Sequence, residues 1–167
     1  MPAKEILLLG NARLYEISEP IEKSELADMR SVVTDLHDTM MAFRKRYGAG
    51  RAIAAPQIGV MKRLIYMHID EPTVFINPEF ISMSAEKIDV WDDCMCFPDL
   101  LVKVERHRSC ILRFRDLDWS ERQMELAGDL SELLQHEYDH LDGILAVSRA
   151  IDGLSFALRS QREVPGH

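Results

Sequence analysis

Two stretches of the chain carry apolar side chains at the spacing of an α-helix. The longer one covers residues 26–47, where apolar positions recur in steps of three and four over about six turns. Ser24 before it is a good N-cap, and Gly48 after it is a common C-terminal stop. A second stretch, residues 127–143, shows the same spacing and ends at Gly143. We therefore expect a long helix early in the chain and a shorter one near its end.

Between these helices, runs rich in β-branched and aromatic residues predict strands. They cover residues 63–69, 73–76, 100–106, 110–115 and 123–126, with a looser alternation over 80–91. We expect Asn77-Pro78 to form a turn, and the tail after Asp152 to form a short helix that frays through Pro165-Gly166. The order helix, strands, helix predicts an α+β fold with an antiparallel sheet. The chain shows no linker or repeat, so we expect residues 1–167 to form a single domain.

Composition narrows the classes of function. The net charge of −8 argues against a nucleic-acid binder, because contacts to phosphates need a basic face. The longest apolar runs, such as residues 6–9, are far too short to cross a membrane, and the N-terminus lacks the pattern of a signal peptide. We therefore expect a cytoplasmic protein with neither a membrane nor a specific nucleic-acid partner. The oligomeric state stays open.

The second predicted helix contains a His-Glu-x-x-His motif at residues 136–140. Residues four apart on a helix share a face, so His136 and His140 can direct two imidazoles at one metal ion. Glu137 adjoins the first imidazole and is placed to exchange a proton with water. The alternative is that two surface histidines and a glutamate coincide by chance. We interpret the motif as the centre of a metal site.

A catalytic metal needs a third protein ligand, and the cysteines offer one. The chain has three, Cys94, Cys96 and Cys110, and an odd number with one close pair is not a secreted disulfide framework. Thiolate with two imidazoles suits Zn²⁺ or Fe²⁺ and leaves one position open for water. Cys94 and Cys96 would face the same side of a strand. Because one thiolate is enough, we expect Cys94 to bind the metal and Cys96 to be a spare small residue.

A loop follows the first predicted helix at residues 48–59, and it combines glycines and alanines with the sequence Ala-Ala-Pro-Gln. Small residues let the backbone approach a ligand closely. We interpret this stretch as a binding loop, with a flexible connector as the alternative.

Three motifs together resemble the peptide deformylase family. That family has G-x-G-x-A-A-x-Q-x-G, then E-G-C-x-S, then Q-H-E-x-D-H. Residues 50–59 resemble the first motif, residues 92–96 resemble the second as Asp-Asp-Cys-Met-Cys, and residues 135–140 match the third fully. The order and spacing are the same, and the resemblance spans most of the chain. It implies a single catalytic domain in which antiparallel sheets pack around a central metal-binding helix.

The resemblance also implies a function, the removal of the N-formyl group from N-formylmethionyl peptides of nascent proteins. The partners would be formylated peptide N-termini, with the ribosome as a candidate place of encounter. One divalent metal is implied, usually Fe²⁺ in this family, with Zn²⁺, Ni²⁺ or Co²⁺ as other candidates. Its ligands would be Cys94, His136 and His140. Glu137 would carry the water proton to the leaving amine, while the Gln57 amide and the Met95 backbone N–H would stabilise the oxyanion.

Further residues are implied around the substrate. The peptide would lie as an added strand between the Arg51 loop and the segment near Asp93. The substrate-binding residues implied are Gly50, Arg51, Ala52, Asp93, Glu132 and Leu133. Asp92 would orient a metal ligand and would itself be oriented by Arg106. Neighbouring side chains on an extended segment point to opposite faces, so we expect the Asp93 carboxylate to lean towards the peptide edge and to repel acidic substrates.

The chain departs from the family pattern mainly where substrate would bind. Ala52 and Asp93 replace glycines, Asp92 replaces glutamate and Cys96 replaces serine, while Glu132 lies where the family lines its methionine pocket with apolar side chains. Three functions therefore stay open: a formyl-peptide deformylase, a metal amidohydrolase on another small amide or formyl substrate, and a catalytically silent protein that binds metal or peptide. The presence of both the Glu-x-x-His glutamate and the loop glutamine argues against the third.

Overall fold

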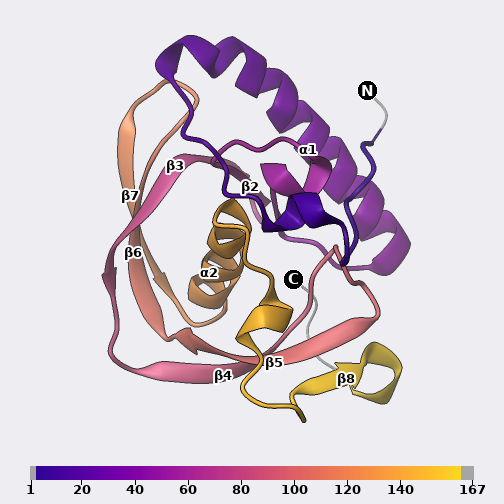
Figure 1. The fold of residues 1–167 in the computed structure, drawn as a ribbon. Coiled ribbons are helices and arrows are strands. Elements are labelled where there is room, and N and C mark those ends of the chain that lie inside the picture. Colours follow the sequence, from indigo (N-terminus) through magenta and orange to yellow (C-terminus); the bar gives the residue numbers. More distant parts are fainter. Residues whose placement is uncertain (1–2, 163–167) are drawn as a thin grey trace.

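The computed structural model describes residues 3–162, and within this range two α-helices accompany two antiparallel sheets (Figure 1). The helices are α1 (Leu26–Tyr47) and α2 (Asp129–Leu141). One sheet has the order β1-β2-β3-β6-β7, and the other has the order β4-β5-β8. The strands are β1 (Ala52–Ala54), β2 (Leu64–His68), β3 (Pro72–Met83), β4 (Lys87–Asp92), β5 (Leu100–His107), β6 (Ser109–Arg115), β7 (Glu121–Ala127) and β8 (Phe156–Leu158). The predicted α+β fold with antiparallel sheets is confirmed.

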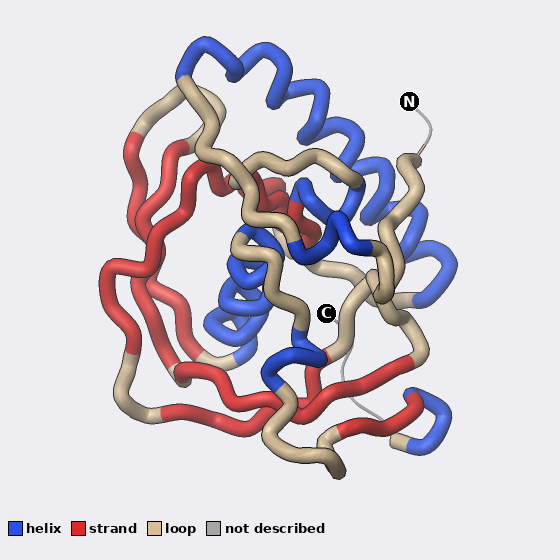
Figure 2. Tube along the Cα trace, viewed as in Figure 1, coloured by secondary structure: helices blue, strands red, loops and turns tan. Residues whose placement is uncertain are grey.

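The helix α2 lies in the middle of the molecule, surrounded by strands of both sheets. In Figure 1 the long strands β3, β6 and β7 curve around one side of α2, β4 and β5 run beneath it, and α1 crosses above. Figure 2 shows the same arrangement, with the α2 helix enclosed by a wall of strands. This position accounts for its burial, because ten of its side chains from Ser131 to Leu141 are shielded from solvent. The predicted central helix is therefore present.

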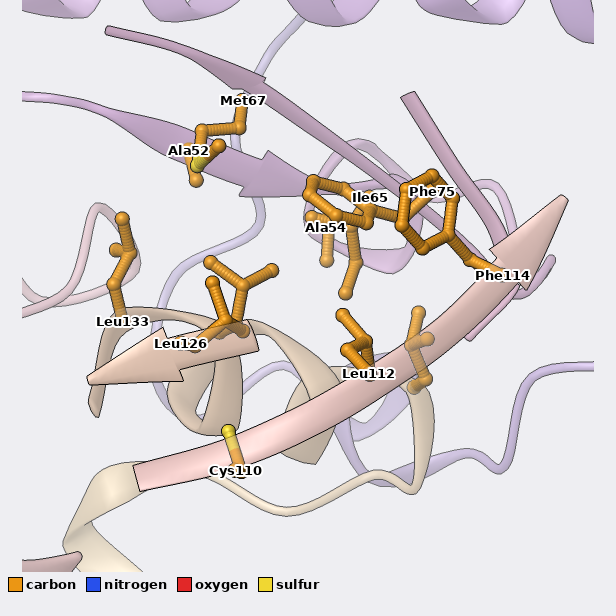
Figure 3. Packing of buried hydrophobic residues seen from close by; sticks show 12 residues of the cluster. Ala52, Ala54, Ile65, Met67, Phe75, Cys110, Leu112, Phe114, Leu126 and Leu133 are labelled. Carbon is orange, nitrogen blue, oxygen red and sulfur yellow. The ribbon is translucent and has the colours of Figure 1, made fainter. Parts of the chain in front are cut away.

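The five-stranded sheet lies between the two helices, and alternate residues of its strands face opposite sides. On β2, Ile65 and Met67 join the core shared with α2, while Leu64 and Tyr66 join the core shared with α1. Figure 3 shows the packing on the α2 side. The cluster there consists of Ala52, Ala54, Ile65, Met67, Phe75, Cys110, Leu112, Phe114, Leu126, Leu133, Leu134 and Leu141. A strand covered on both faces needs apolar residues at every position, which explains the continuous apolar run of β2.

Both predicted helices are present, but two predicted details beside them are wrong. Ser24 is not the N-cap of α1, because a 3-10 turn over Lys23–Glu25 precedes that helix and the Glu25 carboxylate accepts the Glu22 backbone N–H at 2.7 Å. Asn77-Pro78 is not a turn between strands, because β3 continues through it with a shift of register between Ile76 and Glu79. A bulge of this kind tolerates a proline, which has no N–H to donate to the ladder.

The tail also differs from its prediction. A short strand, β8, follows Asp152 in place of a helix and pairs with β5, with Leu158 opposite Leu100 and Phe156 opposite Val102. A single 3-10 turn over Arg159–Gln161 comes next. The predicted fraying through Pro165-Gly166 falls outside the described residues. In residues 3–162 neither α-helix combines the length and the apolar content that crossing a membrane requires.

Candidate metal centre

Three side chains converge inside the protein as possible metal ligands. Cys94, His136 and His140 are all buried, and their ligand atoms lie within 4.8 Å of one another. The two imidazoles project from successive turns of α2, with ring centroids 5.1 Å apart, and Cys94 Sγ lies 3.4 Å from His140 Nε2. A buried thiol with two imidazoles is a donor set for a divalent metal such as zinc or iron. The three residues therefore fit the metal that the sequence predicts.

Cys94 lies beyond the end of a strand. Strand β4 ends at Asp92, residues 93–94 have no regular structure, and residues 95–96 form a turn. The prediction that Cys94 and Cys96 share a strand face is therefore wrong, although their sulfur atoms still lie close together. The Cys96 backbone N–H lies 3.4 Å from Cys94 Sγ, and the Gln57 amide Nε2 lies 3.7 Å from Cys94 Sγ and 3.5 Å from Cys96 Sγ. The turn brings both thiols to the Gln57 side chain.

Burial governs the proton equilibria of the ligands. Burial raises the pKa of the Cys94 thiol well above its usual value, and burial lowers the pKa of His140 well below its usual value. Burial also acts to lower the pKa of His136, but the Asp92 carboxylate outweighs it and raises that pKa to about 9. A metal that binds here must therefore displace protons, since only a thiolate and neutral imidazoles bind metals.

A chain of ion pairs, buried except at Arg149, holds His136 in place. Asp92 Oδ2 accepts a hydrogen bond from His136 Nδ1 at 2.8 Å and another from Arg106 Nη2 at 2.8 Å. Arg106 Nη1 donates to Asp139 Oδ2 at 2.7 Å, and Arg149 donates to both oxygens of Asp139 at 2.6 and 2.9 Å. With Nδ1 occupied by Asp92, the imidazole would offer Nε2 to a metal ion. Asp92 and Arg106 thus have the geometry expected for orienting a ligand, while the contribution of Asp139 and Arg149 was missed, although Asp139 lies in the third motif.

A narrow cleft opens onto the ligands. Its lining residues are Phe43, Ala49, Ala52, Asp93, Cys94, Met95, His136, Glu137 and Arg159. Glu137 therefore shares the cleft with two of the ligands. Gln57 lies deeper, only 1% exposed, and its Oε1 accepts the Ala54 backbone N–H at 2.8 Å. Sequence reasoning missed Phe43, which it assigned only to a helix stripe, and Arg159, which nothing in the local sequence marks.

The residues predicted to bind substrate have different surroundings. Arg51 Nη1 lies 3.1 Å from Asp129 Oδ2, and its Nη2 lies 3.7 Å from Glu132 Oε1, so a cation accompanies the buried Glu132 carboxylate. A Cβ atom at Gly50 would lie 3.1 Å from the Met95 methyl, which explains the small residue at that position. Leu133 is fully buried in the core on the α2 side. The substrate roles of these residues stay predictions.

Asp93 lies beside the metal ligands but is covered. Its side chain is 6% exposed, and its Oδ2 accepts a hydrogen bond from Arg159 Nη2 at 2.6 Å. The expected open carboxylate at a peptide edge is thus covered by an ion pair with the tail of the chain.

Comparisons with known proteins agree in one family. The family model described as polypeptide deformylase matches residues 3–154. The peptide deformylase of Pseudothermotoga lettingae is 34% identical over 158 residues, which cover 95% of this chain and 89% of the relative. The peptide deformylase-like protein of Brucella melitensis is 36% identical over 152 residues, which cover 89% of each chain. A crystal structure of a peptide deformylase from Legionella pneumophila is 31% identical, has a TM-score of 0.82, and covers 92% of this chain and 88% of that one.

Proposed function

The chain belongs to the peptide deformylase family, and from that premise we propose that it removes the formyl group from N-formylmethionyl peptides of nascent proteins. The observation that carries the proposal is the convergence of Cys94, His136 and His140, two of which line one cleft with Glu137. A ligand set alone would suit a structural metal, but a carboxylate beside an open site suits hydrolysis. The same premise supports one catalytic domain over residues 1–167.

The residues at the cleft can carry out the separate steps of amide hydrolysis. A divalent metal in this centre would supply Lewis acidity, which lowers the pKa of water towards neutrality. Glu137 adjoins His136 and lines the cleft, so its carboxylate can take a proton from the attacking water and pass it to the departing amine. The bond that breaks joins the formyl carbon to the methionine nitrogen, and the products are formate and a free N-terminus.

Two donors are available for the oxyanion that forms on the formyl oxygen. The Gln57 amide Nε2 lies only at long contact distance from two sulfur atoms, which are weak acceptors. Its Oε1 is fixed by the Ala54 backbone N–H, so the amide is held in one orientation. Met95 follows Cys94 in the chain and lines the cleft, so we take its backbone N–H as the second donor. Together these donors would stabilise the developing charge without reorganising.

The identity of the metal and the place of action follow from the same proposal. The thiolate and two imidazoles suit Fe²⁺, which we take as the physiological ion, and they also accept Zn²⁺, Ni²⁺ or Co²⁺. Formylated N-termini emerge during translation, so we place the protein in the cytoplasm with nascent peptides, at the ribosome, as its substrates. Its acidic net charge of −8 does not favour binding to nucleic acid itself.

One observation favours a second candidate function, hydrolysis of another small formyl compound or amide. Charged residues stand at two positions where the family pattern has small or apolar ones: Asp93, which lines the cleft and pairs with Arg159, and Glu132, which pairs with Arg51. The first pair alters a wall of the cleft and leaves the ligands and Glu137 in place. A catalytically silent role is disfavoured, since metal binding alone requires neither Glu137 nor Gln57.

The test is formate release by the iron-loaded protein, prepared without oxygen, acting on formyl-Met-Ala-Ser. We expect steady turnover by the wild type. Glu137→Gln keeps the shape of the side chain but cannot accept the water proton, so we expect it to retain metal and to lose roughly 10²–10⁴-fold in kcat.

Metal content of both proteins is the control for this comparison. Turnover of formyl-Met-Ala-Ser at half the wild-type rate by metal-loaded Glu137→Gln would show that another group is the base. A fully metal-loaded wild type that releases no formate from this peptide, but hydrolyses other small amides, would replace the first function by the second.

A further inference from the structure

Arg159 places a guanidinium in the wall of the cleft that holds the metal ligands. It comes from the 3-10 turn after β8, beyond residue 154 where the family match ends. Among the described residues that line the cleft, it is the one lysine or arginine. Its side chain is 36% exposed, whereas Asp93 beneath it is 6% exposed. A substrate that enters the cleft therefore meets the guanidinium before it meets the carboxylate.

The guanidinium is fixed on one side only. Its Nη2 donates to Asp93 Oδ2 at 2.6 Å, and its Nε donates to the Pro98 carbonyl at 3.0 Å. The backbone of the same residue is also held, because the Arg159 N–H donates to the Asp99 carbonyl at 2.9 Å. Its Nη1 makes no hydrogen bond to any residue from 3 to 162. A planar guanidinium held at two of its nitrogens keeps a preorganised donor at the third.

We propose that Arg159 forms a subsite for a substrate carboxylate on the C-terminal side of the formylated residue. This rests on the proposed deformylase function, in which the peptide passes the segment of Asp93. Charge-assisted hydrogen bonds from arginine to carboxylate are among the stronger polar contacts in proteins. Arg159 thus determines specificity and takes no part in the chemistry at the formyl carbon.

The carboxylate can come from two sources. A short substrate such as a formyl-dipeptide brings its own α-carboxylate close to the formyl group, whereas a longer one brings the side chain of Asp or Glu. Asp93 limits the attraction in either case, because its charge offsets that of Arg159. Removing the charge of Asp93 should therefore strengthen the preference for a substrate carboxylate, and removing that of Arg159 should abolish it.

Two pairs of substrates measure the preference for each source. Formyl-Met-Ala with a free carboxylate against its amide tests the α-carboxylate, and formyl-Met-Ala-Glu-amide against formyl-Met-Ala-Gln-amide tests the side chain. Within each pair, the ratio of kcat/KM cancels effects on the metal and on catalysis. We expect the wild type to prefer the acid of at least one pair by about three- to tenfold, the size of a partly exposed charge-assisted contact.

Four variants are expected to change the acid-to-neutral ratio in different directions or not at all. Arg159→Gln should bring the acid-to-neutral ratio to about one or below, and Arg159→Lys should give an intermediate ratio because it keeps the charge and loses the planar geometry. Asp93→Asn should raise the ratio above that of the wild type. The matched control is Arg162→Gln, which removes the same charge three positions along the tail, from a guanidinium that stacks over Trp91 at 4.4 Å. It should leave the ratio unchanged, and metal content and thermal unfolding confirm that each variant is folded.

A binding measurement separates this proposal from the proposed function. Dissociation constants of the same peptides for metal-loaded Glu137→Gln, with and without Arg159→Gln, report the subsite without turnover. If Arg159→Gln leaves the acid-to-neutral ratio unchanged in both turnover and binding, the proposed subsite is wrong. Arg159-dependent binding of acidic peptides by a wild type that releases no formate would instead retain the subsite and overturn the deformylase function.

Discussion

At the scale of single residues, Cys94 and Cys96 differ in role although they lie two positions apart. Only Cys94 belongs to the described group of three converging ligands, whereas Cys96 is buried beside it and lies outside that group. We expect Cys94→Ala to lose most of its bound metal and Cys96→Ser to keep about one equivalent, because the two imidazoles alone leave the ion without its thiolate. Metal analysis after gel filtration measures both.

The pair of variants contains its own control, since each removes one buried thiol from the same turn. Burial raises the pKa of the Cys94 thiol, with Cys96 as a further cause, so the neighbour influences the ligand without replacing it. A full equivalent of metal in Cys94→Ala would mean that Cys96 has taken over, and a loss in both variants would mean that the site needs the two sulfurs together.

Residue by residue, the sequence predicted which three side chains converge, and it missed the ion pairs around them. The spacing of His136 and His140 follows from helix geometry, and it can be read without knowing what packs against the helix. The pairing of Asp93 with Arg159 joins residues 66 positions apart and depends on where the tail folds back. No local rule predicts such a contact. The Asp93 carboxylate was therefore expected to face the substrate, whereas in the structure the Arg159 guanidinium covers it.

At the scale of elements, the end of α2 depends on Gly143. This residue has φ of +70°, and a Cβ atom there would overlap the backbone of Tyr15 and Glu16. We expect Gly143→Ala to lower the free energy of unfolding by about 2–5 kcal/mol, the sum of left-handed strain and steric overlap. Urea unfolding at fixed metal concentration measures the change.

Two other glycines separate the two causes. Gly48 has a left-handed backbone with φ of +72° and nothing within 4 Å of its Cβ position, so Gly48→Ala carries the backbone strain without the overlap. Gly153 has open space and no left-handed backbone, so Gly153→Ala should change the free energy of unfolding by less than about 0.5 kcal/mol. If Gly143→Ala destabilises no more than Gly48→Ala, the contact with Tyr15 relaxes at little cost.

Elements with strong periodicity were predicted, and those that depend on distant partners were not. Both α-helices carry a repeating apolar stripe, and the β6–β7 hairpin follows from the alternation on either side of its turn. The turn predicted at Asn77 is wrong because a distant segment stabilises the bulge there. Asn77 Oδ1 accepts the Ile21 N–H at 2.8 Å, and its Nδ2 donates to the Ile21 carbonyl at 2.9 Å. Strand β8 is only three residues long and exists through its pairing with β5, so it left no pattern to recognise.

At the scale of the whole molecule, the metal centre joins the two sheets. Cys94 follows β4 of the three-stranded sheet, whereas His136 and His140 lie on α2, which shares its main core with the five-stranded sheet. A metal held by all three would therefore cross-link parts of the fold that are far apart in the sequence. Buried contacts between these parts remain without it, including the ion pair of Arg106 with Asp139 at 2.7 Å.

We therefore expect chelation to weaken the molecule unevenly. Loss of a metal that was present at 100 times its dissociation constant removes about 2.7 kcal/mol of stability, which corresponds to a fall in Tm of roughly 5–11 °C at this chain length. Calorimetry of the metal-loaded and chelated proteins measures this fall.

The loss of the metal should also open the fold locally, most of all beside Cys94. We therefore expect hydrogen exchange to accelerate in β4 and residues 93–97 more than in β6, which lies inside the five-stranded sheet. The control is Cys94→Ala, which should resemble the chelated wild type and should not respond to the chelator. Equal acceleration in β6 and β4 would mean that the metal stabilises the fold as a whole, and unchanged exchange at residues 93–97 would mean that the ion pairs of Arg106 hold the two sheets together without it.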